Sequence, residues 1–233
     1  MFSPLSPKEA KNMKQGIPMI LVPYRDNKEQ KRSEQLKKFT NHIARYHPDW
    51  PVLIIEQSEG QKFNRGALLD IGARIANKLN IEYVIFHDVD LIPLSPLVPY
   101  YTTFPEKPIH VGSAYKDKYT GDGFLGQALS ISLKDIKKIN GFPRMFWGWG
   151  GEDDAMRNRM KKKGMTVWRP TLDYGYKVLE HKDTRLIPDA KNMRKWEDVK
   201  EDTGQHGYSD VKWTVLDEIE LSTNIKKLTV EIK

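Results

Sequence analysis

The sequence predicts an α/β fold, in which a mostly parallel β-sheet is flanked by helices. Apolar runs of strand length occur within residues 17–27, 51–57 and 81–86, and amphipathic segments separate them. Such an alternation is typical of a parallel sheet with crossover helices. Because 39% of the 233 residues are hydrophobic, the chain can build a substantial core. We therefore expect one domain over residues 17–233, preceded at residues 1–16 by a polar tail or a short helix.

The first half of the chain contains two helical patterns. Residues 28–48 place Leu36, Phe39 and Ile43 at helical spacing, and the pattern stops before Pro48. Residues 63–80 form a second apolar stripe, made by Leu68, Leu69, Ile71 and Ile75. We expect both helices to turn these side chains toward the sheet.

The second half continues the alternation. Residues 128–141 predict a short strand and then a helix that ends near a glycine. Residues 152–164 predict another helix, because acids occupy the first turn, lysines the last turn, and a glycine follows. Residues 166–170 predict a strand, and the alternating segments 211–222 and 226–233 predict an antiparallel pair.

Two long segments, residues 100–125 and 184–207, lack strong periodicity and contain several glycines. We expect them to be loops near a site, the second of them able to close as a lid.

Composition excludes several classes of protein. The chain has no cysteine, so disulfides and thiolate metal sites are excluded, which suits a reducing compartment. Residues 1–16 contain no apolar run long enough for a signal peptide or anchor, and no later run is long enough to span a membrane. We expect a cytoplasmic protein, with peripheral contact at the inner membrane face as an option that scattered lysines would support.

The net charge of +7 raises nucleic acid as an alternative partner. The lysines alternate with acids and predict solvated helix faces. No helix-turn-helix, zinc-finger or RNA-binding signature is present, so we expect no nucleic-acid partner.

Residues 144–154, RMFWGWGGEDD, concentrate the residue types of a carbohydrate site. The glycines permit close approach of the backbone to a ligand, and Trp147 and Trp149 offer flat faces for a sugar ring. Helix capping explains one acid, but the run Glu152-Asp153-Asp154 exceeds that need. We interpret this stretch as a binding or catalytic loop.

Asp88 and Asp90 follow the apolar run 81–86. In an extended chain, residues two apart face the same way, so these carboxylates would project together. A divalent cation would relieve their repulsion, whereas the alternative is a surface turn after a strand. His181 and Asp183 repeat the spacing, and a structural role for the histidine stays open beside a metal role.

These motifs together resemble the β-1,4-galactosyltransferase family, which are inverting glycosyltransferases of GT-A fold. The resemblance covers roughly residues 18–232, and its blocks occur in family order: VPYRDN, FNRGALLDIG, FHDVDLIP, INGFPRMFWGWGGEDD and GYKVLEHKD. FHDVDLIP and the WGWGGEDD block carry most of the specificity.

The resemblance implies a role for each matching position. Asp153 would be the general base, and Asp154 with Trp149 would bind the acceptor. The positions implied to hold the UDP-sugar donor are Tyr24, Arg25, Phe63, Arg65, Asp88, Val89, Phe124, Trp149 and Glu152. Phe124 stands near the family's donor-gating tyrosine, Gln127 replaces a glycine beside Gly126, and Asn27 replaces an arginine.

The resemblance also implies a metal, Mn²⁺ with Mg²⁺ as the alternative. Val178 replaces a methionine that ligates the metal in many members, and Asp183 stands where the xylose-acceptor branch has a histidine. We therefore predict Asp90, His181 and Asp183 as the ligands.

The implied activity is metal-dependent, inverting transfer of galactose or N-acetylgalactosamine from a UDP-sugar to a hydroxyl of a glycan or lipid-linked glycan, in β-1,4 linkage. The alternative is a catalytically silent UDP- or sugar-binding module of the same fold. The intact carboxylates favour the enzyme, since loss of activity should remove them first.

Overall fold

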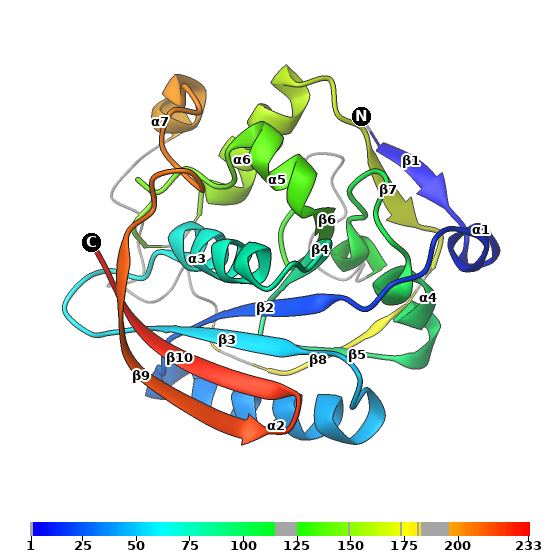
Figure 1. The fold of residues 1–233 in the computed structure, drawn as a ribbon, viewed down its shortest axis with the longest axis horizontal. Coiled ribbons are helices and arrows are strands. Elements are labelled where there is room, and N and C mark those ends of the chain that lie inside the picture. Colours follow the sequence, from blue (N-terminus) through cyan, green and yellow to red (C-terminus); the bar gives the residue numbers. More distant parts are fainter. Residues whose placement is uncertain (1, 115–124, 149, 173, 181, 183–195) are drawn as a thin grey trace.

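The computed structural model describes residues 2–114, 125–148, 150–172, 174–180, 182 and 196–233. Its centre is a six-stranded sheet with the strand order β6-β4-β2-β3-β10-β9 (Figure 1). The strands are β2 (Met19–Tyr24), β3 (Val52–Gln57), β4 (Tyr83–His87), β6 (Ala128–Ser132), β9 (Trp213–Ser222) and β10 (Ile225–Ile232). β2, β3, β4 and β10 run parallel, whereas the edge strands β6 and β9 are antiparallel to their neighbours. The predicted mixed, mostly parallel sheet is confirmed.

Helices cover both faces of the sheet (Figure 1). α3 (Arg65–Lys78), α5 (Leu133–Ile139) and α6 (Glu152–Lys162) pack on one face. α2 (Arg32–Tyr46) and α4 (Val98–Thr102) pack on the other. Strands buried on both faces read as continuous apolar runs, which explains why the runs at β2, β3 and β4 were visible in the sequence.

Shorter elements complete the described chain. β5 (Leu91–Pro93) pairs antiparallel with β8 (Tyr176–Val178), and α7 (Trp196–Glu201) follows later. Three 3₁₀ turns are η1 (Lys28–Gln30), η2 (Ser95–Leu97) and η3 (Val111–Ala114). The expectation of a continuous loop over residues 100–125 is therefore wrong for its first part, because α4 and η3 bury several apolar side chains there. Within the described residues, no helix has the length and apolarity to cross a bilayer.

The N-terminus contains the short helix that was expected and a strand that was not. α1 (Pro7–Asn12) begins with a capping box between Ser6 and Glu9. β1 (Phe2–Leu5) precedes it and pairs in parallel with β7 (Val167–Pro170). The strand escaped prediction because its four residues include a proline and show no alternation; its order comes from pairing with β7.

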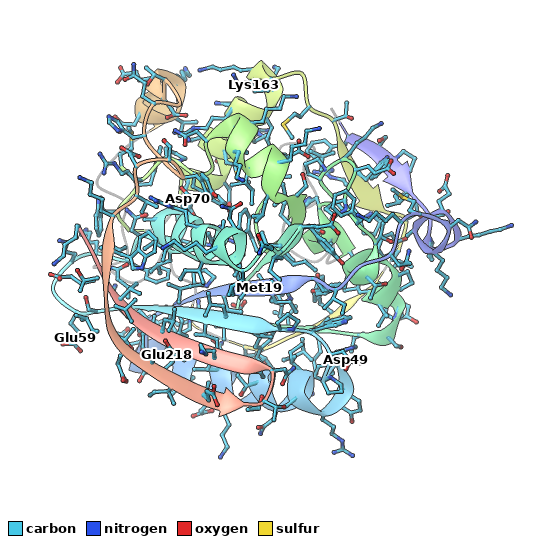
Figure 2. The ribbon with its side chains drawn as sticks, viewed as in Figure 1. Met19, Asp49, Glu59, Asp70, Lys163 and Glu218 are labelled. Atoms are coloured by element: carbon cyan, nitrogen blue, oxygen red, sulfur yellow. The ribbon has the colours of Figure 1, made fainter. Side chains whose placement is uncertain are left out.

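Asp70 is the buried carboxyl of α3, in contrast to Asp49, Glu59, Lys163 and Glu218 at the periphery (Figure 2). Its carboxyl accepts the Phe142 N–H at 3.1 Å. Gly141 has a φ of +58°, and a Cβ there would lie 2.0 Å from Asp70 Oδ1. Burial raises the pKa of Asp70 well above its ordinary value, although the Phe142 N–H and Arg159 oppose the shift.

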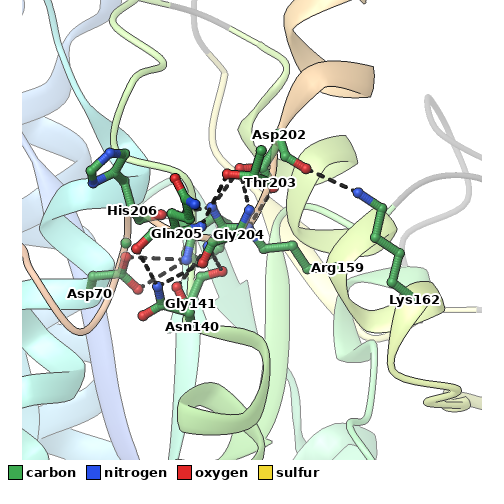
Figure 3. Close-up of polar contacts among 12 residues, drawn as sticks. Asp70, Asn140, Gly141, Arg159, Lys162, Asp202, Thr203, Gly204, Gln205 and His206 are labelled. Carbon is green, nitrogen blue, oxygen red and sulfur yellow. Dashed lines mark hydrogen bonds and ion pairs between the residues drawn. The ribbon is translucent and has the colours of Figure 1, made fainter.

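Arg159, near the end of α6, connects the segment after α7 to α6 and to the end of α5 (Figure 3). Arg159 Nε and Nη2 donate to the Asp202 carboxylate at 2.6 and 2.7 Å, and its Nη1 donates to the Asn140 carbonyl at 2.7 Å. Nη2 also donates to the His206 carbonyl at 2.7 Å, and Nη1 to the Gly141 carbonyl at 3.2 Å. We call Arg159, Asp202, Asn140, Gly141 and His206 the Arg159 clasp. Residues 202–207 were expected to belong to a mobile lid, but the clasp binds them firmly to α5 and α6.

Candidate active site

The site residues predicted from sequence follow the carboxyl ends of parallel strands. Tyr24 ends β2, Arg65 begins the helix after β3, and Asp88 directly follows β4. In open α/β sheets this edge is where ligands bind, because loops from neighbouring strands converge there. Tyr24 is buried, and its hydroxyl donates to Asp26 at 3.5 Å.

The loop between β3 and α3 is held by local hydrogen bonds. Arg25 Nη1 donates to the Gln61 carbonyl at 2.6 Å, and its guanidinium lies 5.5 Å from the centre of the Phe63 ring. Asn64, fully buried, caps α3 by accepting the Ala67 N–H at 2.9 Å. These contacts place Arg65 at the first position of the helix.

The glycine-rich loop before α6 is joined to the same place. Asn64 Nδ2 donates to the Arg144 carbonyl at 2.7 Å, and the Gly148 N–H donates to the Phe63 carbonyl at 2.7 Å. Gly150 and Gly151 have φ values of +92° and +94°, which side-chain-bearing residues rarely adopt. The glycines are thus required by the backbone path that brings the start of α6 to Arg65.

Arg65 lies among three carboxylates. Its Nε donates to Asp88 Oδ1 at 3.0 Å, its Nη1 donates to Asp153 Oδ1 at 2.9 Å, and Nη1 lies 3.9 Å from Glu152 Oε1. Burial lowers the pKa of the guanidinium, but the carboxylates outweigh burial and raise it above its ordinary value. We call these four residues the Arg65 cluster. It joins β4 to the start of α6, so both predicted acidic motifs meet in one place.

Glu152 is the least satisfied member of the Arg65 cluster. Its side chain is 10% exposed, and Oε2 has no hydrogen-bond partner among the described residues. Burial, together with the charge of Asp153, raises the pKa of Glu152 to about 7, although Arg65 opposes the shift. A buried carboxyl oxygen without a donor favours a ligand that brings a hydroxyl.

Asp88 and Asp90 do not project together from an extended strand, so that prediction is wrong in its geometry. β4 ends at His87, and residues 88–90 form a turn in which the Leu91 N–H donates to the Asp88 carbonyl at 3.3 Å. The turn directs the two carboxylates to different arginines, Arg65 and Arg32. Burial raises the pKa of Asp88; Arg65 opposes the shift, and Asp90 adds to it. Val89, between them, is buried in the core.

Asp90 is the predicted metal ligand that the structure describes. It is 8% exposed, and its Oδ2 lies 3.2 Å from Arg32 Nη1. The Leu179 N–H donates to its backbone carbonyl at 2.8 Å, which places the chain before His181 beside Asp90. A buried carboxylate oxygen that already attracts a cation suits Mn²⁺ or Mg²⁺.

The other predicted ligands, His181 and Asp183, lie outside the described residues, as do Phe124 and Trp149. Within the part of the chain that the structure covers, no group of three or more His, Cys, Asp or Glu residues is arranged to hold a metal.

A buried polar chain supports the turn after β4. His87 Nδ1 donates to the Asp88 carbonyl at 2.8 Å, so its Nε2 accepts from the Tyr101 hydroxyl at 2.7 Å. The Tyr101 oxygen in turn accepts from the Tyr176 hydroxyl at 2.9 Å. Burial lowers the pKa of His87 to about 4, so the imidazole is neutral at pH 7. This chain joins the acidic turn to β8, which leads toward His181.

Asp154 does not belong to the Arg65 cluster. It pairs with Arg157 one turn along α6 at 3.4 Å, and burial raises its pKa. Two further residues at the site, Arg32 and Gln35, escaped the sequence analysis, because their segment resembles a solvated helix face. The one available signal was that Gln35 precedes Phe39 by four residues, so it lies on the buried face of the helix.

The mostly parallel sheet, with helices on both faces and an acidic turn at its carboxyl edge, matches the GT-A class of glycosyltransferases. Residues 4–102 match the model described as the N-terminal region of glycosyl transferase group 7, and residues 106–182 match one described as the N-terminal domain of galactosyltransferase. The chain belongs to the β-1,4-galactosyltransferase family, and the resemblance drawn from sequence motifs is confirmed.

Curated relatives support this assignment. The chain is 34% identical over 193 residues to xylosylprotein 4-beta-galactosyltransferase of Caenorhabditis elegans, covering 80% of this chain and 63% of that protein. It is 36% identical over 180 residues to human beta-1,4-galactosyltransferase 4, covering 75% of this chain and 51% of that protein. The chain thus spans between half and two thirds of the length of these relatives.

Two solved structures share the fold over nearly the whole chain. The catalytic domain of Drosophila β-1,4-galactosyltransferase 7 in complex with xylobiose has a TM-score of 0.76 and 26% identity, with 94% of each chain covered. A mutant of that protein in complex with manganese, UDP-Gal and xylobiose has a TM-score of 0.79 and 25% identity, with the same coverage.

Proposed function

We propose that this protein transfers galactose from UDP-galactose to a hydroxyl of a glycan acceptor, with inversion at the anomeric carbon. The observation that carries the proposal is the Arg65 cluster, in which a buried arginine faces three carboxylates and one carboxyl oxygen lacks a donor. The complex of the Drosophila relative with manganese, UDP-Gal and xylobiose supports the choice of substrates.

The donor lies, in this proposal, along the carboxyl edge of β2, β3 and β4. Tyr24, Arg25 and Phe63 surround the uridine diphosphate end, with Val89 behind them. Asp88 binds the ribose, and Phe124 and Trp149 complete the site. Glu152 accepts a hydroxyl of the sugar, which supplies the donor that its Oε2 lacks.

Asp153 is the proposed general base. As the bond between the acceptor oxygen and the anomeric carbon forms, the bond from that carbon to the diphosphate oxygen breaks, and its electron pair leaves with UDP. The acceptor proton passes to an Asp153 oxygen. Asp153 lies in the first turn of α6, and the neighbouring Asp154 orients the acceptor.

Arg65 links donor binding to this base. It is the nearest described cation to Asp153, and in the proposal it also contacts the diphosphate. When some N–H groups of the Arg65 guanidinium donate to phosphate oxygens, its hydrogen bond to Asp153 becomes weaker. An Asp153 oxygen that Arg65 releases in this way is available to receive the acceptor proton when the donor is in place.

The proposed metal ligands are Asp90, His181 and Asp183. A divalent ion bound there neutralises the charge that develops on the departing diphosphate. In the protein itself, Asp90 is held by the turn after β4 and by its bond to Leu179, so its position does not depend on the ion.

UDP release tests the proposal directly. The purified protein is supplied with UDP-galactose or UDP-N-acetylgalactosamine, with Mn²⁺ or with chelator. Acceptors ending in xylose, glucose or N-acetylglucosamine are compared, and the product linkage is read by NMR. We expect metal-dependent release with UDP-galactose and a β-linked product. UDP binding without turnover across the panel would indicate the silent binding module instead, and the absence of both would refute the proposal.

A further inference from the structure

The first turn of α2 carries an arginine that the proposed reaction does not use. Arg32 Nη1 lies 3.2 Å from Asp90 Oδ2 and also donates to Gln35 Oε1 at 2.9 Å. The side chains of Arg32 and Asp90 are only 19% and 12% exposed. A contact with this little solvent is screened far less than a surface ion pair.

Gln35 extends the contact to the chain before His181. It is 2% exposed, and its Nε2 donates to the Glu180 carbonyl at 3.2 Å. The neighbouring Leu179 N–H donates to the Asp90 carbonyl at 2.8 Å. Arg32, Gln35, Asp90 and the 179–180 backbone therefore form one closed hydrogen-bonded ring.

We propose that Arg32 is a resident counter-cation of Asp90, which a divalent metal must displace in order to bind. The inference rests on the proposed function, since it takes Asp90 as a metal ligand. Without metal, the guanidinium lies against this largely buried carboxylate and offsets part of its negative charge. A divalent ion on the same carboxylate would lie within a few ångströms of the guanidinium, and like charges at that distance repel strongly.

Displacement requires that Arg32 can leave without breaking the site. Asp90 stays in place through the Leu179 bond, and Gln35 retains its bond to Glu180. The contact of Arg32 with Asp90 is a single one through Nη1 at 3.2 Å, in contrast to the two-atom grip of Arg159 on Asp202. A one-point contact is easier to break than a fork-to-fork pair.

The test is a titration of the nucleotide-free protein with Mn²⁺, with free Mn²⁺ followed by electron paramagnetic resonance. In Arg32→Gln we expect the Kd for Mn²⁺ to be roughly threefold to thirtyfold lower than in the wild type, the size of one charge-assisted contact. An unchanged or higher Kd would overturn the proposal.

Lys31→Asn is the matched control, because it removes the same charge from the adjacent, exposed residue. Lys31 has a φ of +55°, a conformation that asparagine tolerates. We expect its Kd to stay within about twofold of the wild type. Equal tightening in both variants would mean long-range repulsion rather than displacement, and would refute the inference.

Two further measurements distinguish a failure of metal displacement from the absence of the metal site and from misfolding of the variant. Loss of Mn²⁺ binding in Asp90→Asn is expected. No Mn²⁺ binding by the wild type would remove the metal site itself, and displacement with it. If Arg32→Gln is too unstable to titrate, Arg32→Lys replaces it, with a Kd at least about twofold below the wild type expected. Mn²⁺ should also raise the Tm of that variant more than the Tm of the wild type; an equal rise would count against displacement.

Discussion

Arg65 and Arg159 are both largely buried and both bind carboxylates. They differ in how completely the charges and hydrogen-bonding groups around them are paired. Arg159 binds the Asp202 carboxylate through two nitrogens and donates to three backbone carbonyls, and both side chains are 3% exposed. Arg65 is shared among three carboxylates, and Glu152 Oε2 has no partner among the described residues.

The difference separates a structural ion pair from a candidate binding group. In the Arg159 clasp every charge has a close, well-aligned partner, so a ligand has nothing to add. The Arg65 cluster has three carboxyl groups and one guanidinium, and Glu152 Oε2 has no hydrogen-bond donor among the described residues. A cluster of this kind is stabilised when a substrate supplies hydroxyl groups to the carboxyl oxygens, which is the state that an active site should favour.

The largest expected effect is on turnover, when Asp153 of the Arg65 cluster is changed. Asp153→Asn should lower turnover by ~10²–10⁴-fold while UDP binding is retained, because an amide accepts no proton from the acceptor. Initial rates of UDP release and calorimetric titration with UDP measure the two quantities. Asp135→Asn removes a first-turn acid of α5 that forms no ion pair among the described residues, and should leave turnover within about twofold. Near-normal turnover in Asp153→Asn would remove it as the base.

The next effect is on the structural side. Arg159→Met should lower the free energy of unfolding by about 3–5 kcal/mol, because it leaves Asp202 buried without its partner. Urea denaturation gives the value. Lys161→Met, on the exposed side of the same helix, should change it by less than about 0.5 kcal/mol. If Arg159→Met instead reduced nucleotide affinity in a fully stable protein, the clasp would belong to the site.

Prediction from sequence succeeded for most helices and strands, and for the antiparallel pair of β9 and β10. It failed for the side-chain contacts between segments that are distant in the sequence. The ends of α6 were visible because acids, lysines and Gly164 mark them locally, and Gly164 indeed has a φ of +67°. Arg159 lies in the same basic stretch as solvated lysines, and nothing local distinguishes it. Its partner Asp202 is 43 residues away, so the clasp depends on the tertiary fold.

The candidate site shows the same limit. The Arg65 cluster could be anticipated as a location, since strand ends and the glycine-rich loop converge there. The turn at 88–90 was only the alternative interpretation, because the spacing of Asp88 and Asp90 was taken to continue an extended chain. Arg32 and Asp90 are 58 residues apart, and their contact leaves no periodic trace in either segment.

The pH dependence of the free energy of unfolding should distinguish Glu152 from the fully paired charges of the Arg159 clasp. Its pKa is raised from 4.5 to about 7 in the folded protein. Between these values the folded state holds a proton that the unfolded state releases, so stability falls as pH rises and is level above pH 7. Asp70, whose pKa is also raised, acts in the same direction.

Glu152→Gln removes the Glu152 part of this dependence. From pH 4.5 to pH 8, the stability of the variant relative to the wild type should increase by on the order of 1–3 kcal/mol. Urea denaturation at both pH values measures the change, and Asp70→Asn reports the other contribution. A difference between variant and wild type that is independent of pH would mean that Arg65 offsets both burial and the charges of Asp153 and Asp88, so that Glu152 keeps its ordinary pKa.

The smallest expected effect on stability concerns Lys162, an exposed residue that also contacts Asp202 of the Arg159 clasp. It tests whether burial, rather than the number of contacts, determines the contribution of a donor. Lys162 Nζ donates to the Asp202 backbone carbonyl at 3.0 Å (Figure 3), so Asp202 binds cations from two residues of α6. Lys162 is exposed, and water replaces its contact when the side chain is shortened. Lys162→Met should therefore change the free energy of unfolding by less than about 0.5 kcal/mol. A loss approaching that of Arg159→Met, measured by the same urea denaturation, would show that the clasp is a cooperative network of all its donors rather than one buried ion pair with an exposed neighbour.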